Sequence, residues 1–253
     1  MARNNRAYPQ WQRPLAFAIA LIVWQGAAML VREPIFLSSP LDVLLRLFEL
    51  LREAHFFTVL FYSLGRVLLG YFAGLALGCL LAMAAARLPI LETLLYPYMV
   101  TIRSVPVASF VVLALLWFSS ASLSGLISFL IVLPLVYQNV LAALQAIDPQ
   151  LGEMAAVFHL SFGNRLRCIY LPGVRPALLS SAATAMGLAW KSGVAAELIG
   201  MPDYSIGLEL YRAKLYLDTP ALFAWTLVIV LASLLCEKLV GLLLRFLLGG
   251  WRT

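Results

Sequence analysis

Charged residues are scarce in this chain. Only 12% of its 253 residues are Asp, Glu, Lys or Arg, against about 25% in a typical soluble domain. Apolar residues make up 63% of the sequence. So few charges cannot cover so much apolar surface, which excludes an ordinary soluble protein. The composition therefore predicts an integral membrane protein, with residues 1–253 forming a single transmembrane domain.

Sequence motifs for nucleotide binding and catalysis are also missing. The chain has no Gly-x-x-x-x-Gly-Lys-Ser/Thr loop, no Rossmann fingerprint, no His-Glu-x-x-His and no Gly-x-Ser-x-Gly. Its three cysteines, Cys79, Cys168 and Cys236, lie too far apart for a metal or disulfide pattern, and there are only two histidines. An intramembrane enzyme would need a paired nucleophile and base, or a metal cluster, so it is a much weaker alternative.

Long apolar runs make up most of the chain, and about 20 apolar residues are enough for a helix to cross the hydrocarbon. The uncharged run from Ser104 to Ile147 would be about 66 Å long as one helix, roughly two bilayers, so it must fold back. The polar stretch 119–125 supplies the turn. The fold class predicted is all-α, with about six spans near residues 15–31, 59–86, 100–118, 124–146, 177–199 and 221–247.

Basic residues gather at the ends of these runs, a pattern of membrane topology rather than of nucleic acid binding. With six spans, the side of the N-terminus holds nine basic and three acidic residues, and the other side five basic and seven acidic. The more basic side of a multi-pass protein faces the cytoplasm. We therefore expect a multi-pass membrane protein whose termini and 147–176 loop are cytoplasmic.

The loop between the fourth and fifth spans turns polar and basic but keeps helical signals. Asp148 and Pro149 are a good N-cap and first helical residue. Ser161 is a second N-cap candidate, and Pro172 is expected to end the helix that follows. The loop is thus predicted to form two short helices on the membrane surface, joined near His159, which would suit the docking of a partner.

Charges inside spans are costly, so each is a candidate for function. Arg103 and Lys238 are predicted near enough to the cytoplasmic interface for their side chains to reach it. Lys191 and Glu197 share the fifth span but are six residues apart and point to different faces. Arg66 is the expected partner of Glu197, because buried charges are usually paired. Both a structural ion pair and the lining of a solute route fit Arg66 and Glu197.

Trp190 stands directly before Lys191, and an aromatic ring beside a cation would suit an anionic or zwitterionic solute. An ion-coupled secondary transporter would explain Lys191 and Glu197, but not the cytoplasmic loop.

Two further patterns predict how helices pack. Gly70, Gly74 and Gly78 form a stripe on the second span, which favours close packing against a helix of the same subunit; a seam between two subunits is the alternative. In residues 41–53 the apolar residues recur with a helical period and the charged residues lie on the opposite face. This pattern predicts an amphipathic helix on the outer face of the membrane.

Six segments of the chain form an ordered set of motifs. They are 63–70 (at the start of the second span), 103–106 (an Arg-x-x-Pro element), 153–176 (a loop that begins Glu-x-Ala-Ala), 189–191, 196–197 and 206–207. This set resembles the permeases of the nitrate/sulfonate/taurine type among ATP-binding-cassette importers. One motif alone would be weak, but these follow one another in the family's order over nearly the whole chain after residue 35.

The resemblance implies a permease subunit, in the bacterial inner membrane, of an ATP-driven importer for a small solute such as nitrate, a sulfonate, taurine or a related organic compound. It implies a homodimer or a closely related pair, two ATPase subunits that carry the ATP and Mg²⁺, and an extracytoplasmic solute-binding protein. The chain itself would hold no metal, cofactor or catalytic residue, and would contact lipid but no nucleic acid. The ATPase-coupling residues implied are Glu153, Ala155, Ala156, His159, Leu171 and Pro172.

His159 departs from this family pattern, which usually has Gly six residues after the Glu of the loop. Gly suits such a turn because it accepts a positive φ angle, which His adopts at a cost. We expect His159 either to be a strained residue or to make a contact with the ATPase that Gly could not make.

Overall fold

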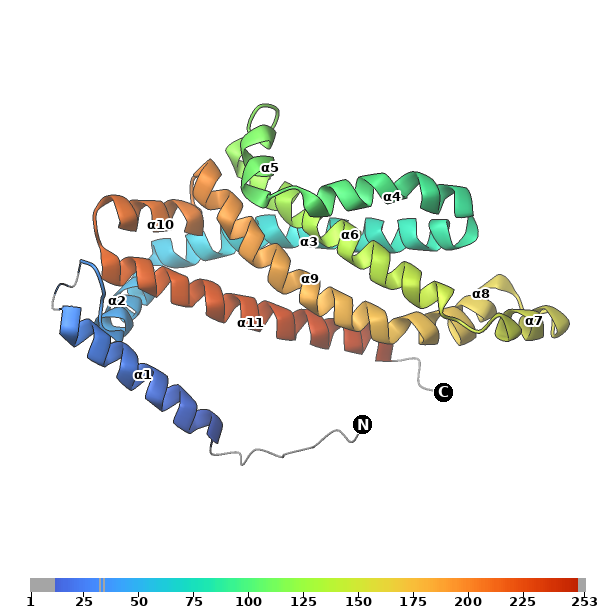
Figure 1. The fold of residues 1–253 in the computed structure, drawn as a ribbon, viewed down its shortest axis with the longest axis horizontal. Helices are drawn as coiled ribbons and strands as arrows, with labels where there is room; N and C mark the ends of the chain where they lie inside the picture. Colours follow the sequence, from blue (N-terminus) through green and yellow to red (C-terminus); the bar gives the residue numbers. More distant parts are fainter. Residues whose placement is uncertain (1–11, 32, 34, 250–253) are drawn as a thin grey trace. The chain divides into compact units, whose positions relative to one another are not determined.

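Residues 12–31, 33 and 35–249 are described by the computed structural model, and all regular structure among them is helical (Figure 1). The first helices are α1 (Gln12–Val31), α2 (Pro40–Arg52), α3 (Ala54–Arg87), α4 (Pro89–Ser104), α5 (Val107–Ala114) and α6 (Ser120–Gln145). Then follow α7 (Pro149–Val157), α8 (Phe162–Arg165), the π-helical turn η1 (Leu166–Tyr170), α9 (Leu171–Gly200), α10 (Ile206–Leu215) and α11 (Thr219–Gly249). The predicted all-α membrane fold is confirmed. Arg3, Arg6, Arg32 and Arg252, which entered the charge count, lie outside the described residues.

Four helices in the described part of the chain are long and apolar enough to cross a membrane. They are Pro14–Val31, Ala54–Arg87, Ser120–Gln145 and Thr219–Leu247, close to four of the predicted spans. The predicted span 177–199 lies within α9, which is not among these four. Because α9 carries charged and small residues and buries much of its surface against other helices, its apolar signal is weaker. The count of six spans stays a prediction.

The predicted span 100–118 is wrong as a continuous helix. The chain forms α4 and α5 instead, and the two helices bend by 100° at Val105 and Pro106. Pro106 lacks a backbone N–H, and the residue before a proline is pushed out of the helical region, as the φ of −76° and ψ of 129° at Val105 show. Arg103 consequently lies in the last turn of α4, where it donates to Gln138 of α6, and not at the start of a span.

The chain falls into two compact units. One comprises the described residues up to Phe57 together with Glu209–Val228. The other comprises Thr58–Leu208 and the described residues from Ile229 onward. The second unit holds the predicted site residues.

In the first unit, α2 is the predicted amphipathic helix. A capping box starts it: Ser39 Oγ accepts from the Asp42 backbone N–H at 3.2 Å, and Asp42 Oδ2 accepts from the Ser39 N–H at 3.3 Å. Arg46 bonds Glu49 at 2.9 Å and Asp218 at 3.3 Å. The hydrogen bond to Glu49 raises the pKa of Arg46, against the effect of partial burial, so this side chain stays charged. The exposed apolar side chains of α2 include Leu41, Leu44, Leu45 and Phe48.

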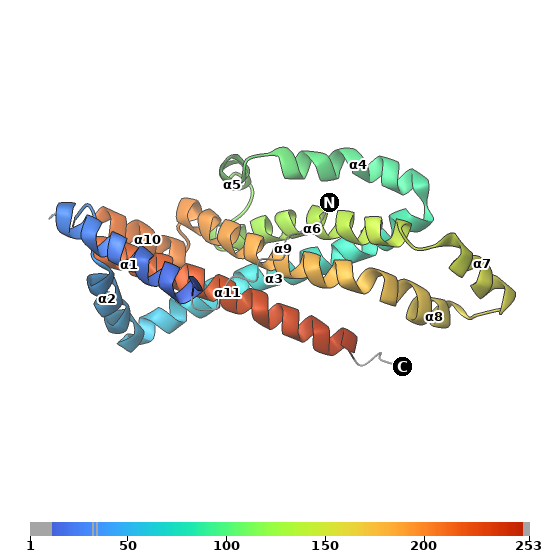
Figure 2. The same ribbon diagram turned by 60° about the horizontal axis from the view of Figure 1, so that its bottom comes forward.

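The second unit is built on α3, α6 and α9, which pack side by side (Figures 1 and 2). The glycine stripe of α3 lies against α6 of the same chain, so the prediction of an intrasubunit contact is confirmed. A Cβ at Gly70 would overlap the backbone of Gly125, and Cβ atoms at Gly74 and Gly78 would crowd α6 at about 3 Å. The absence of side chains lets the two backbones approach closely.

Hydrogen bonds connect α9 to both other helices of this core. Tyr71 Oη of α3 donates to the Ala182 carbonyl oxygen at 3.0 Å, and Ser128 Oγ of α6 donates to that of Ala189 at 3.1 Å. All four residues are fully buried. Away from water, such bonds fix how the helices are rotated against one another.

Candidate functional site: the α7 segment and the Glu197 cluster

The helix α7 begins as predicted. Asp148 is its N-cap, with Oδ1 accepting from the Gln150 backbone N–H at 2.9 Å, and Pro149 is its first residue. Glu153 lies in the second turn of α7. The helix dipole acts mainly on the first turn, so it contributes little at Glu153.

The helix ends at the predicted position as well. The Leu160 N–H donates to the Ala155 carbonyl oxygen at 2.9 Å, and the His159 N–H to that of Ala156 at 3.1 Å. His159 itself has a φ of 48°. This pair of bonds around a left-handed residue is a Schellman motif, in which Gly is preferred. The prediction of a positive φ at His159 is confirmed.

Arg165, which the sequence analysis did not select, connects α7 to the segment that follows. Its Nε donates to the Leu160 carbonyl oxygen at 3.0 Å, and its Nη2 to that of Ala155 at 3.4 Å. Basic side chains commonly bind the free carbonyls at helix ends. That preference was a usable signal, but Arg165 is ten residues from Ala155, and only the turn at His159 brings them together.

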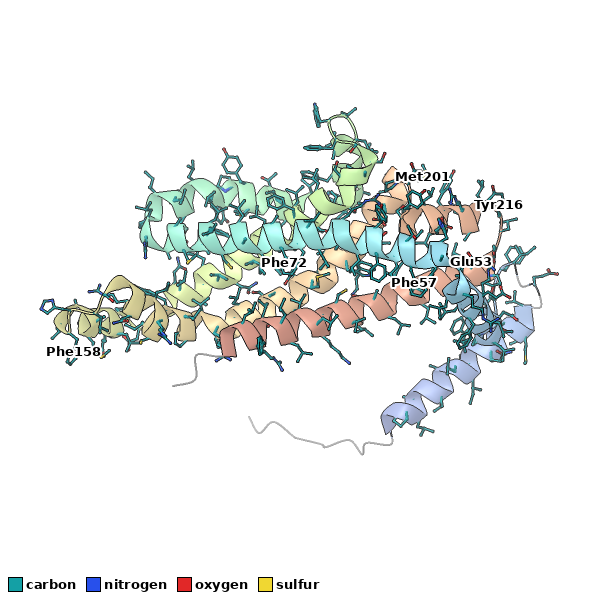
Figure 3. The ribbon with its side chains drawn as sticks, turned by 180° about the vertical axis from the view of Figure 1, so that it is seen from behind. Glu53, Phe57, Phe72, Phe158, Met201 and Tyr216 are labelled. Carbon is teal, nitrogen blue, oxygen red and sulfur yellow. The ribbon has the colours of Figure 1, made fainter. Side chains whose placement is uncertain are left out.

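The surface of α7 is unusual for a helix outside the apolar spans. Ala155 is fully buried and Ala156 and Glu153 are exposed. Four large apolar side chains also face outward, with Val157 74% and Phe158 70% exposed. Figure 3 shows Phe158 at the outer end of the segment, beyond the ends of α6 and α9. The exposed apolar residues of α7 and its C-cap are Leu151, Met154, Val157 and Phe158.

The second half of the loop differs from the prediction. Ser161 does cap α8, since its Oγ accepts from the Asn164 N–H at 3.4 Å. Pro172 does not end a helix, because α8, η1 and α9 follow one another without a break. Proline is tolerated in the first turn of a helix, where Pro172 stands in α9 after Leu171, and the wider π turn precedes it. The loop therefore passes directly into α9.

The structure brings Arg66 and Glu197 together, the pair expected from the sequence. Glu197 has no exposed surface. Its Oε2 accepts from Ser63 Oγ at 2.7 Å, and its Oε1 lies 3.7 Å from Arg66 Nη1. Arg66 Nη2 also donates to the Asp203 carbonyl oxygen at 3.0 Å. A buried carboxylate needs such partners, because the loss of water would otherwise cost several kcal/mol.

The same cluster fixes the chain after α9. The Ile206 N–H donates to Ser63 Oγ at 3.0 Å. Gly207 lies so close to Glu197 that a Cβ would overlap the backbone there. Two motifs that are ten residues apart in the sequence thus form one packed unit with α3. In this structure Glu197 takes part in the packing of α3 against α9 and the residues that follow α9.

Trp190 and Lys191 are adjacent in the sequence, but their side chains have different environments. Trp190 is fully buried, and its Nε1 donates to the Ile229 carbonyl oxygen at 2.9 Å, whereas Lys191 is exposed. The indole therefore packs among other residues of the described part of the chain. Among the described residues, no three His, Cys, Asp or Glu side chains gather as a metal site would require.

Comparison with known proteins gives a family. Residues 74–252 match the binding-protein-dependent transport system inner membrane component family. The chain is 28% identical to the putative aliphatic sulfonates transport permease of Bacillus subtilis, over 96% of this chain and 88% of the relative. It is 27% identical to the taurine transport system permease of Escherichia coli (90% and 88%) and to the riboflavin transport system permease of Chloroflexus aurantiacus (95% and 90%).

The all-α membrane fold is consistent with a membrane component of a transport system. Because the family covers most of the chain, the protein belongs to the binding-protein-dependent transport system inner membrane components. It is a permease subunit of an ATP-binding-cassette importer, not an enzyme.

Proposed function

We propose that this chain carries a small solute across the membrane when an ATPase docked on α7 binds and hydrolyses ATP. The observation that carries the proposal is the combination of rigidity and exposure in α7. Asp148 and Arg165 fix its two ends, yet Val157 and Phe158 expose large apolar surfaces. Exposed apolar side chains on a well-fixed helix favour a protein partner, because an apolar groove would remove them from water.

The family implies association with an ATPase and a solute-binding protein. We propose a pair of permease chains, either identical or closely related, above two ATPase subunits that hold the ATP and Mg²⁺. ATP then favours one conformation of the pair through contacts that differ between the inward- and outward-open states. Since α7 is joined to α9 through α8 and η1, a displacement of α7 would reach the helix that carries Glu197.

The proposed topology places the α7 segment in the cytoplasm, where an ATPase would be. Its support is the charge distribution of the sequence, with nine basic and three acidic residues on the side of the termini in a six-span arrangement. Single cysteines at Leu160 and Leu210 of a cysteine-free chain should then react with impermeant reagents from opposite sides. Reaction from one side would contradict this topology.

The solute we propose is a sulfonate, taurine, nitrate or a related small organic compound. Relatives named for aliphatic sulfonates and taurine support the first two. The test is growth of a host that lacks its own sulfonate importers on taurine or ethanesulfonate as the only sulfur source. We expect growth when the chain is expressed with its ATPase and binding protein, and none with a hydrolysis-deficient ATPase. Growth that is independent of ATP hydrolysis would contradict an ATP-driven mechanism.

A further inference from the structure

A cavity of about 970 Å³ lies where α3 and α6 end and α9 begins, beside α7 and α8. Its volume is near the upper end of the range for small-molecule sites, about 300–1,000 Å³. Most of its lining is apolar, and it includes Leu80, Met83, Leu144, Ile147, Val174 and Leu178.

The charged residues that line this cavity are mostly basic. Arg87, the last residue of α3, and Arg167 of η1 both line it and are exposed, and Asp148 is the one acid among the lining residues. A guanidinium group has five N–H donors, so it can bind a phosphate while keeping a protein partner. The cavity therefore joins an apolar interior to a cationic opening.

The depth of the cavity also fits a membrane lipid. Its lining on α3 extends from Arg87 back to Cys79, about 12 Å along the helix axis. Arg87 is the last residue of α3, an apolar helix long enough to span the bilayer, so we expect the two arginines near the level of the headgroups. Basic pockets between membrane helices bind the anionic headgroups of lipids. We propose that this cavity binds an anionic phospholipid, with an acyl chain inside and the phosphate on Arg87 and Arg167.

A lipid in this position would touch the coupling segment. Gly152 of α7 and Gly163 of α8 line the cavity, and neither would meet another atom within 4 Å if it carried a Cβ. The lipid would fill that space and support α7 from the membrane side. This consequence for coupling rests on the proposed function, whereas the binding itself does not.

The test uses the chain's own cysteines. Cys79 lines the cavity and is half-buried, and Cys168 is exposed and outside the lining, so it serves as an internal control. The full chain, purified and delipidated in neutral detergent, is alkylated with N-phenylmaleimide, and each cysteine is followed by mass spectrometry. We expect phosphatidylglycerol at about ten times its Kd to slow alkylation of Cys79 about tenfold. Phosphatidylcholine should protect much less, and Cys168 should be unaffected by either lipid.

Variants separate the acyl chain from the headgroup. Gly152→Leu fills the cavity from α7 with a better helix former and should abolish protection. Arg87→Gln with Arg167→Gln should reduce protection to the level of phosphatidylcholine. Arg245→Gln, an exposed arginine of α11 outside the cavity, should change nothing.

Three results would overturn the inference. They are equal protection by both lipids, no protection by phosphatidylglycerol, and protection that depends on protein concentration alone, which would indicate a second copy in the cavity. Because no ATPase is present, none of these results bears on the transport function. Failure of the chain to assemble with its ATPase would count against that function and leave lipid binding intact.

Discussion

Two glutamates of the second compact unit have opposite environments, although each belongs to a motif of the family. Glu197 is fully buried, bonds Ser63 and pairs with Arg66. Glu153 is exposed on α7, among apolar side chains that also face outward. Glu197 thus contributes to the packing of α3 against α9, whereas Glu153 lies on the exposed surface of α7.

This difference teaches that the structural environment of a charged motif residue in a membrane permease has to be known before a role is assigned to it. The polar contacts of Glu197 are made by residues of its own chain. Around Glu153, hydrogen bonds fix both ends of α7, but the helix exposes apolar side chains. The comparison predicts that substitutions in the Glu197 cluster change stability, and that substitutions on α7 change assembly.

The largest expected effect is that of Glu197→Ala. It leaves Arg66 without its ion pair and Ser63 without its acceptor, which should cost about 3 kcal/mol of stability. Glu197→Gln should be milder, because the amide can still accept from Ser63. Thermal unfolding of the purified chain in detergent is the measurement. Glu153→Ala is the matched control, and a comparable loss of stability there would contradict the comparison.

The next effect concerns the glycine stripe. Gly70→Ala introduces a Cβ that overlaps the backbone of Gly125, so α3 and α6 have to separate, at a cost of about 2 kcal/mol. Gly65→Ala in the same helix has open space at its Cβ and should be neutral or slightly stabilising. Unfolding curves of the two variants that coincide would show that α3 and α6 do not pack as described.

A smaller effect is expected from Arg165→Gln. The two carbonyl oxygens at the end of α7, of Ala155 and Leu160, lose their side-chain donor, which should loosen the segment by about 1 kcal/mol. Hydrogen exchange of the α7 amides should rise while that of the core of α9 stays unchanged. Arg245→Gln, an exposed arginine of α11, is the control. If the α7 amides stay equally protected from exchange, Arg165 does not stabilise this segment.

An effect of similar size but opposite sign is expected from His159→Gly. The φ of 48° costs His about 1 kcal/mol relative to Gly, so the substitution should stabilise the loop slightly. If the imidazole contacts the ATPase, as we expect, the same variant should reduce the yield of the assembled complex and the stimulated ATP hydrolysis. Wild-type complex yield and wild-type stimulated ATP hydrolysis would contradict a contact of His159 with the ATPase and leave only backbone strain at this position.

Local signals in the sequence predicted much of this site. Asp148 and Pro149 are sufficient to start α7, and the place of His159 in the motif was sufficient to expect a positive φ. The pair of Arg66 and Glu197 followed from the cost of burying a charge alone. In each case the physical cause lies in a few neighbouring residues or in one strong energetic requirement.

The rest depends on contacts that no local pattern contains. The bend between α4 and α5 follows from Pro106, but the apolar run on both sides of it reads as a single span. Arg165 reaches α7 only through the turn at His159. Burial of Trp190 and the cavity between α3, α6 and α9 arise from packing of distant segments. The prediction that Pro172 ends a helix is wrong because a π turn can continue into a helix with proline in its first turn.

The central claim is that α7 is presented to an ATPase rather than packed into the permease, and Val157→Asp tests it most directly. Val157 is 74% exposed, so the carboxylate remains in water in the free chain and is buried only by a partner. The measurement is the amount of ATPase retained by the tagged permease, together with its melting temperature. We predict that the ATPase is lost while the melting temperature is unchanged. Full retention of the ATPase with normal uptake would contradict the account.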